Sequence, residues 1–268
     1  MLFTDKLLSA GRQNKSLLCV GLDPDVTLMP RVGLLDFNKG IIDATADLVC
    51  AYKPNLAFYE ALGIDGLKAL QKTVEYIPNS IPVIGDGKRG DIGNTSKAYA
   101  RALFETFGFD AATVSPYLGY DSVQPFLEYK DKGIFILCRT SNPGASDFQS
   151  LVDAGGTPLY ETVAGKASEW NTQGNIGLVV GATYPGELKA IRQLCPEMPL
   201  LIPGVGAQGG DLLSAVKNGI DAQGEKAIIA VSRQVLYASK GRDFAQAARR
   251  TAQGLREEIN KIIGQILQ

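Results

Sequence analysis

The sequence of 268 residues contains no histidine. Imidazole is the usual general base of serine and cysteine hydrolases and a frequent zinc ligand. Its absence therefore excludes Ser-His-Asp and Cys-His catalysis as well as HExxH metal sites. Any chemistry must depend on carboxylates, lysine, arginine and hydroxyl groups.

Cysteines and long apolar runs are also scarce. The four cysteines, Cys19, Cys50, Cys138 and Cys195, are far apart and form no CxxC pair, so we expect no metal-binding knuckle. No apolar run approaches the ~18 residues of a membrane-spanning helix. The N-terminal segment has no signal-peptide pattern. We therefore predict a cytoplasmic protein with reduced cysteines and no membrane partner.

Neither sign of charge is in excess. The 27 basic and 28 acidic side chains give a net charge of −1, which offers no electrostatic basis for nucleic-acid binding. Hydrophobic residues make up 45% of the chain and charged residues 21%, as in ordinary globular proteins. No linker, repeat or low-complexity tract divides the sequence, so we expect residues 1–268 to form a single domain.

Short apolar runs recur along the chain and alternate with segments of helical spacing. The runs cover residues 17–23, 51–57, 81–88, 111–117, 133–140, 176–183, 200–206 and 227–233. Such runs are typical of parallel strands buried on both faces. Helical segments are expected at residues 37–49, 60–76, 159–170, 186–194, 211–218 and 244–267, and another after Asn94 or Thr95, either of which is a suitable N-cap. The alternation predicts an α/β fold, a (β/α)8 TIM barrel, with an open doubly wound sheet as the alternative.

Charged residues stand at the carboxyl ends of several predicted strands, where barrel enzymes place their chemistry. Asp23 follows the first strand, Lys53 lies in the second, Asp86 and Lys88 end the third, and Arg233 ends the eighth. The two-residue period of a strand predicts that Asp86 and Lys88 lie on one face. A structural ion pair is the alternative interpretation of these two residues.

The longest polar, glycine-rich stretch is residues 141–158, after the fifth predicted strand. We interpret it as a loop over the mouth of the barrel rather than as a hinge between domains.

Residues 203–211, PGVGAQGGD, contain the GxGxxG pattern of dinucleotide-binding sites after a strand and before a helix. We reject that site because the next strand ends in Ser232-Arg233 rather than in an acidic ribose ligand. A phosphate cradle is the better interpretation. Backbone N–H groups of the glycine loop, a helix N-terminus near Asp211, the Gln208 amide and the Arg233 guanidinium would converge on one dianion. Barrels frequently bind phosphate after the seventh and eighth strands.

Together these motifs resemble those of the orotidine 5′-phosphate decarboxylase family, in its longer bacterial branch. DxKxxDIxxT at residues 86–95, SNPG at 141–144, PGVGAQGG at 203–210 and SR at 232–233 stand in the family's order. The resemblance implies a homodimer of (β/α)8 barrels. It also implies a carboxy-lyase of pyrimidine biosynthesis that converts orotidine 5′-monophosphate (OMP) to UMP and CO2 without a metal or organic cofactor.

The resemblance also implies roles for single residues. Lys88 resembles the lysine that protonates C6 of the pyrimidine, with Asp86 near the substrate carboxylate and Lys53 completing the charged array. Asp91 resembles a second catalytic carboxylate, which enters the partner subunit's site together with Ile92 and Thr95. The implied substrate contacts are Asp23 for the ribose, Ser141 or its neighbour Thr140 for the pyrimidine, Gln208 and Arg233 for the phosphate, and also Pro203, Gly209 and Ser232.

The implied reaction needs no imidazole. Loss of CO2 leaves a carbanion at C6, which an ammonium group at Lys88 stabilises and then protonates. Nearby carboxylates favour that ammonium form. Repulsion between Asp86 and the substrate carboxylate is worth roughly 4 kcal/mol at about 4 Å and an effective dielectric near 20, whereas enzymes lower barriers by about 8–23 kcal/mol. Carbanion stabilisation and binding energy from the phosphate are therefore expected to supply most of the effect.

Two other functions fit parts of the pattern. The DxKxxD string also resembles barrel enzymes that act on sugar phosphates with a magnesium ion, such as 3-keto-gulonate 6-phosphate decarboxylase and hexulose-phosphate synthase. Ile92, Thr95, the SNPG motif and the absence of histidine speak against these enzymes. A non-catalytic barrel that only binds a nucleotide or phosphate metabolite is the other alternative, but such a barrel has no need for an array of Asp86, Lys88 and Lys53.

Overall fold

The structure is a computed structural model that describes residues 1–206 and 208–268. In this part of the chain eight parallel strands form one sheet of order β2-β1-β8-β7-β6-β5-β4-β3. The strands are β1 (Leu18–Leu22), β2 (Ala51–Pro54), β3 (Ile84–Arg89), β4 (Ala111–Val114), β5 (Gly133–Arg139), β6 (Ile176–Val180), β7 (Leu200–Pro203) and β8 (Ala227–Val231). Bridges from Tyr52 to Val83 and from Asn55 to Asp86 join the two edge strands. The predicted (β/α)8 barrel is therefore confirmed, and the open sheet is excluded.

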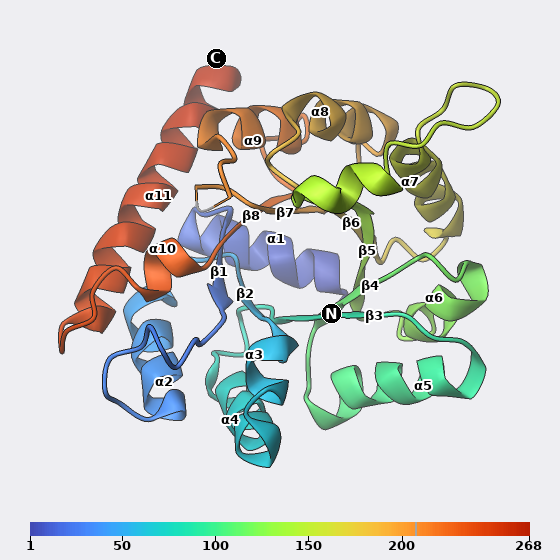
Figure 1. The fold of residues 1–268 in the computed structure, drawn as a ribbon. Coiled ribbons are helices and arrows are strands. Elements are labelled where there is room, and N and C mark those ends of the chain that lie inside the picture. Colours follow the sequence, from blue (N-terminus) through green and yellow to red (C-terminus); the bar gives the residue numbers. More distant parts are fainter. Residues whose placement is uncertain (207) are drawn as a thin grey trace.

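Helices surround the ring of strands, and α1 lies across it (Figure 1). They are α1 (Phe3–Asn14), α2 (Leu34–Thr45), α3 (Leu56–Glu60), α4 (Gly63–Tyr76), α5 (Gly93–Arg101) continued by the π-helical turn η1 (Ala102–Thr106), α6 (Tyr120–Leu127), the 3₁₀ turn η2 (Pro143–Asp147), α7 (Leu159–Trp170), α8 (Pro185–Leu194), α9 (Leu212–Gly219), α10 (Arg233–Leu236) and α11 (Phe244–Ile266). Helices α1, α3, α6 and α10 were not predicted from the sequence pattern, apart from the last residue of α3.

Side chains along each strand alternate between two apolar layers, one between the strands and the helices and one inside the barrel. In β1, Leu18, Val20 and Leu22 face the surrounding helices, whereas Cys19 faces the barrel interior. All four side chains are fully buried. Because alternate residues of a parallel strand are buried on opposite faces, near-continuous apolar runs are the sequence signature of this barrel.

Helix α1 closes the amino-terminal end of the barrel. Its buried Phe3 and Leu7 pack with the interior residues of the strands, and the Phe3 ring meets Phe135 edge to face at 5.6 Å. A Cβ atom at Gly133 would clash with the Phe3 ring, so the absence of a side chain at this position makes room for helix α1. The carboxyl ends of the strands are left as the open mouth.

Three local predictions need correction. The helix expected at residues 60–76 is confirmed over Gly63–Tyr76 as α4, but Glu60 ends the separate short helix α3, and Gly63 (φ 64°) begins α4 in a left-handed conformation. Helix α5 begins at Gly93 with Ile92 at its N-cap, so neither Asn94 nor Thr95 caps it. The loop of residues 141–158 was predicted correctly only at its start, where Ser141 and Asn142 line a cavity at the barrel mouth. A bridge between Val152 and Pro158 closes a hairpin, which projects outward beyond α7 (Figure 1).

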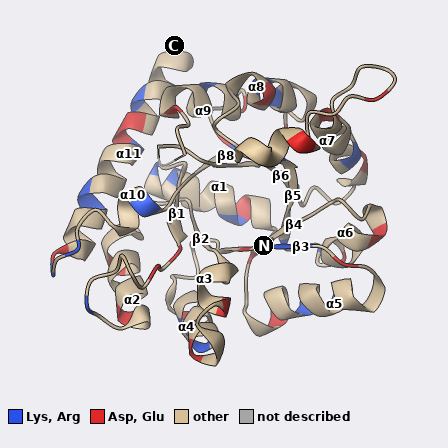
Figure 2. Cartoon of the chain, in the orientation of Figure 1, with Lys and Arg blue, Asp and Glu red and all other residues tan. Residues whose placement is uncertain are grey.

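Charge is distributed evenly over the helical shell. Figure 2 shows acidic and basic residues interspersed on the surrounding helices, in keeping with the net charge of −1. Among the described residues, no helix combines the length and apolar character needed to cross a membrane.

Candidate active site

A cavity of about 650 Å³ opens at the carboxyl ends of the strands. Apolar residues from β5 to β8, including Leu137, Val179 and Leu201, form part of its wall. Nine of the predicted site residues line it: Asp23, Lys53, Asp86, Lys88, Ser141, Pro203, Gln208, Ser232 and Arg233. The structure therefore brings together residues from six strand ends and their loops that are up to 210 positions apart.

One carboxylate organises the charges at the base of this cavity. Lys53 donates a hydrogen bond of 2.8 Å to Oδ2 of Asp86, and Lys88 donates one of 2.7 Å to Oδ1. The side chains of Asp86 and Lys53 are each 8% exposed, whereas that of Lys88 is 48% exposed. The prediction that Asp86 and Lys88 share one face is confirmed. Of the two ammonium groups, only that of Lys88 is widely open to the cavity.

Both buried partners are held in their charged forms. Burial alone would raise the pKa of Asp86, but the charges of Lys53 and Lys88 and their hydrogen bonds lower it well below the ordinary carboxyl range. Burial would likewise lower the pKa of Lys53, but the charges of Asp86 and Asp23 and a hydrogen bond from Lys53 to Asp86 raise it above its ordinary value. Asp86 and Lys53 are therefore both charged over the whole physiological range.

The backbone of Lys88 is strained in a way that the sequence pattern does not indicate. Its φ angle is 45°, in the left-handed region that non-glycine residues rarely occupy. Thr113, from β4, holds this conformation, because its Oγ1 accepts a hydrogen bond of 2.9 Å from the Lys88 N–H. The same hydroxyl donates to Oδ1 of Asp86 at 2.9 Å. Strain of this kind persists where the surroundings over-determine it, often at functional sites.

Thr113 was missed in the sequence analysis, although a signal for it existed. It lies two residues after the inward-facing Ala111 in a strand that was predicted correctly. Period two therefore points its hydroxyl into the barrel.

Asp23 is fixed from two neighbouring elements. Its Oδ1 accepts a hydrogen bond of 3.1 Å from the backbone N–H of Asn55. Its carbonyl oxygen accepts one of 2.8 Å from the hydroxyl of Tyr237, which in turn accepts one of 2.6 Å from the Asp25 N–H. Asn55, Asp25 and Tyr237 also line the cavity but were not predicted.

Two adjacent hydroxyls face the cavity at the end of β5. Ser141 donates a hydrogen bond of 2.5 Å to Oε1 of Gln208. Thr140 donates to Oδ1 of Asn142 at 2.7 Å and accepts from Nε2 of Gln149 at 2.9 Å. The Ser141–Gln208 bond joins the loop after β5 to the loop after β7.

The glycine loop after β7 differs from the predicted phosphate cradle. The N–H groups of Gly206, Gly209 and Gly210 donate to carbonyls within the loop, and Ala207 lies outside the described residues. The carboxylate of Asp211 caps helix α9 by accepting a hydrogen bond of 2.8 Å from the Ser214 N–H. These three loop N–H groups and one N–H of the first turn of α9 are therefore engaged internally, and phosphate binding by the rest of the loop stays a prediction.

Three side chains near this loop are candidates for binding an anion. Arg233 and Gln208 line the cavity together with Ser232, whose buried Oγ has no hydrogen-bond partner among the described residues. Gly21 allows this crowding, because a Cβ atom there would lie 2.9 Å from the Ser232 Cβ. These three side chains are suited to bind a phosphate group through hydrogen bonds and one positive charge.

Four predicted site residues do not line the cavity: Asp91, Ile92, Thr95 and Gly209. Asp91 accepts a hydrogen bond of 2.8 Å from the N–H of Ile92 at the start of α5. The side chain of Ile92 is 55% exposed. Within one chain, the loop after β3 therefore turns these residues toward the surface.

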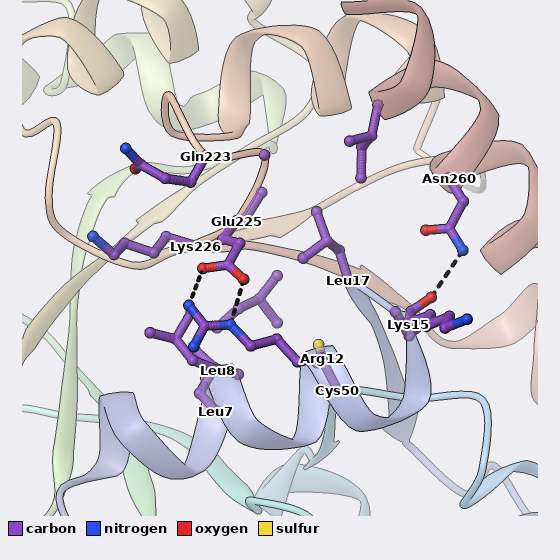
Figure 3. A pocket seen from close by; sticks show the side chains of 16 residues that line it. Leu7, Leu8, Arg12, Lys15, Leu17, Cys50, Gln223, Glu225, Lys226 and Asn260 are labelled. Carbon is purple, nitrogen blue, oxygen red and sulfur yellow. Dashed lines mark hydrogen bonds and ion pairs between the residues drawn. The ribbon is translucent and has the colours of Figure 1, made fainter. Parts of the chain in front are cut away.

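A second cavity, of about 210 Å³, lies at the amino-terminal end of the barrel between α1 and α11 (Figure 3). Three of its charged side chains form ion pairs. Arg12 forms two hydrogen bonds with Glu225, at 2.7 and 2.8 Å, and Lys226 bonds to Glu197 at 2.6 Å. Charges at this face of a barrel stabilise the fold rather than perform chemistry.

Among residues 1–206 and 208–268, no three His, Cys, Asp or Glu side chains lie close enough to hold a metal ion. The four cysteines are free and buried.

The sequence is similar to a known protein family and to named relatives over most of its length. The sequence pattern of the Orotidine 5'-phosphate decarboxylase / HUMPS family matches residues 16–250. A protein of Dehalococcoides mccartyi named orotidine 5'-phosphate decarboxylase is 59% identical over 265 residues, which cover 97% of this chain and 98% of that protein. One of Herpetosiphon aurantiacus with the same name is 56% identical over 259 residues, covering 94% and 96%.

Two solved structures superpose on nearly the whole chain. OMP decarboxylase of Leishmania donovani superposes with a TM-score of 0.86 at 41% identity, covering 98% of this chain and all of that one. UMP synthase of the same organism gives a TM-score of 0.90 at 43% identity, and the match covers 98% of this chain but 57% of the synthase.

Proposed function

The chain belongs to the Orotidine 5'-phosphate decarboxylase / HUMPS family and has the decarboxylase activity for which its relatives are named, and we propose that Lys88 carries out the central step. The substrate is OMP and the products are UMP and CO2. The observation that supports this role is the array in which Asp86 holds the buried Lys53 and the open Lys88 by hydrogen bonds of 2.8 and 2.7 Å.

The array performs the reaction by electrostatic stabilisation and proton transfer. As the bond from C6 to the carboxylate breaks, its electron pair stays on C6. The Lys88 ammonium group stabilises this charge and then gives C6 a proton. Asp86 remains ionised throughout, because its pKa lies well below the ordinary range. It therefore presents a negative charge near the substrate carboxylate. The repulsion between these two charges is relieved when CO2 leaves.

The two ends of the cavity hold the rest of the nucleotide. We assign the phosphate to Arg233, Gln208 and Ser232, where a guanidinium and an unpartnered hydroxyl lie together. Asp23 binds the ribose hydroxyls through its carboxylate. Ser141 contacts the pyrimidine, since its hydroxyl faces the cavity beside Gln208.

A homodimer completes the site in this proposal. Asp91, Ile92 and Thr95 do not line the cavity of their own chain, and we assign them to the site of the partner subunit. Exposed apolar side chains in the loops after β3 and β4 support this arrangement: Ile92 is 55%, Tyr117 82% and Leu118 48% exposed. Such a patch on a folded protein is typical of an interface.

The proposal also places the enzyme in the cytoplasm. All four cysteines are unpaired thiols in buried positions, as expected in a reducing compartment.

A direct assay tests the function against the sugar-phosphate alternative. The protein is incubated with OMP in the presence of EDTA, and loss of the orotate absorbance is followed together with UMP formation. We expect full activity with the chelator and none on a hexulose 6-phosphate. Activity that disappears with EDTA and returns with magnesium would favour the alternative, and absence of UMP would contradict the proposal.

A further inference from the structure

Gln149 joins the two ends of the loop that follows β5. Its Oε1 accepts a hydrogen bond of 2.8 Å from the Thr140 N–H, and its Nε2 donates one of 2.9 Å to Oγ1 of the same residue. One amide side chain therefore closes residues 140–149 into a compact loop. The residues next to the closure, Ser141 and Asn142, line the active-site cavity.

In the closed loop the Thr140 hydroxyl both donates and accepts a hydrogen bond. Its proton is donated to Oδ1 of Asn142 at 2.7 Å, and its oxygen receives the Gln149 amide. The Ser141 hydroxyl donates to Gln208 at 2.5 Å but receives no hydrogen bond within the described residues. It therefore keeps lone pairs for an N–H donor such as that of a pyrimidine ring.

A buried arginine sets the orientation of the amide. Arg139 is 2% exposed; its guanidinium stacks on Tyr184, 3.7 Å from the ring centroid, and lies 3.4 Å from Glu187. Its NH1 group also faces Oε1 of Gln149 at 3.4 Å. A positive charge on this side favours the amide oxygen there, which leaves the amide nitrogen to face Thr140.

We propose that Gln149 is a positioning residue for base recognition. It engages the Thr140 hydroxyl in hydrogen bonds at the wall of the cavity and holds the loop so that Ser141 alone contacts the pyrimidine. It does not touch the substrate itself. The inference rests on the proposed function, because it assumes that a pyrimidine nucleotide occupies the cavity.

The test compares a ligand that has the base with one that lacks it. Calorimetry measures the affinity of wild-type protein and the Gln149→Ala variant for UMP and for ribose 5-phosphate. We expect Gln149→Ala to weaken UMP binding about tenfold, on the scale of one or two lost hydrogen bonds, and to change ribose 5-phosphate binding less than twofold. Gln173→Ala, at an exposed glutamine in the loop before β6, is the matched control and should change neither affinity.

The isosteric variant Gln149→Glu keeps the acceptor for the Thr140 N–H but loses the amide donor. We expect its UMP affinity to lie between those of wild type and Gln149→Ala, again without an effect on ribose 5-phosphate. This variant tests the inference even if Gln149→Ala does not fold. Unchanged UMP binding, or equal losses with both ligands, would overturn the positioning role. A wild-type protein that binds no UMP would instead contradict the proposed function.

Discussion

Asp86 accepts a hydrogen bond of 2.7 Å from the ammonium group of Lys88, two residues further along strand β3. Both residues line the cavity at the carboxyl end of the barrel, although the backbone of Lys88 departs from the extended conformation of the strand. The other carboxylate oxygen is bound by Lys53 at 2.8 Å. One buried acid thus anchors a lysine that is 48% exposed and available to a ligand.

Removing this lysine should abolish turnover but not binding. Lys88→Ala takes away the proton donor, so we expect kcat for OMP to fall by about 10²–10⁴-fold, the usual contribution of a positioned acid. UMP binding, measured by calorimetry, should persist because its phosphate contacts are intact. Lys68→Ala, at an exposed helical lysine, is the control. Near-normal turnover of Lys88→Ala would show that another group protonates C6.

Neutralising the acid should destabilise the protein. Asp86→Asn leaves Lys53 buried without its counter-charge, a change that typically costs about 3–5 kcal/mol. Urea unfolding at pH 7 measures this loss. Asp47→Asn, which affects the exposed Arg249–Asp47 pair, should cost about 1 kcal/mol or less. Equal effects of the two substitutions would mean that the Lys53–Asp86 pair is not buried in solution.

The difference in stability between wild type and Asp86→Asn should become smaller as the pH falls. The folded-state pKa of Asp86 is depressed by Lys53 and Lys88, so its contribution to stability is present above the unfolded carboxyl pKa of about 3.9. That contribution is lost as pH falls toward the folded pKa. The stability gap between wild type and Asp86→Asn should therefore shrink by about 1.4 kcal/mol per pH unit below about pH 4. A gap that stays constant or widens in acid would contradict the depressed pKa.

Phosphate binding should depend on Arg233. Arg233→Ala removes the guanidinium from the cavity, and we expect kcat/KM for OMP to fall by about 10–100-fold, as for a lost charged hydrogen bond. The nucleoside orotidine, which has no phosphate, should react equally slowly with wild type and variant. Arg249→Ala is the surface control. An equal loss with both substrates would exclude a role in phosphate binding.

Shared sites predict complementation. Lys88→Ala and Asp91→Ala homodimers should each be inactive, but mixed dimers have one site with both groups intact. We expect activity to return to about a quarter of the wild-type value after subunit exchange, on the statistics of random pairing. Subunit exchange verified by differently tagged chains, with no recovery of activity, would contradict the assignment of Asp91 to the partner's site.

Much of the barrel could be predicted because parallel strands bury both faces and leave near-continuous apolar runs. The residues at their ends, such as Asp86 and Lys88, then follow from period two. Helix α1 was missed because the repeating alternation begins at the first strand, although Phe3, Leu7 and Ala10 show helical spacing. Helix α6 was missed because Pro125 lies within it.

The details of the loops could not be predicted in the same way. The glycine loop after β7 was expected to point its N–H groups at a ligand, but those of Gly206, Gly209 and Gly210 bond to carbonyls within the loop. The left-handed backbone of Lys88 depends on a hydrogen bond with Thr113 from the next strand. The loop closure by Gln149 depends on residues 140–149 folding back so that their two ends meet. Such features arise from tertiary contacts, which residue type and spacing do not encode.

The most direct test of the central claim is a crystal structure of the protein with UMP bound. The account predicts that Nζ of Lys88 lies within about 3.5 Å of C6, with Asp86 still bonded to both lysines and the phosphate against Arg233. A pyrimidine ring whose C6 faces away from Lys88 would contradict it.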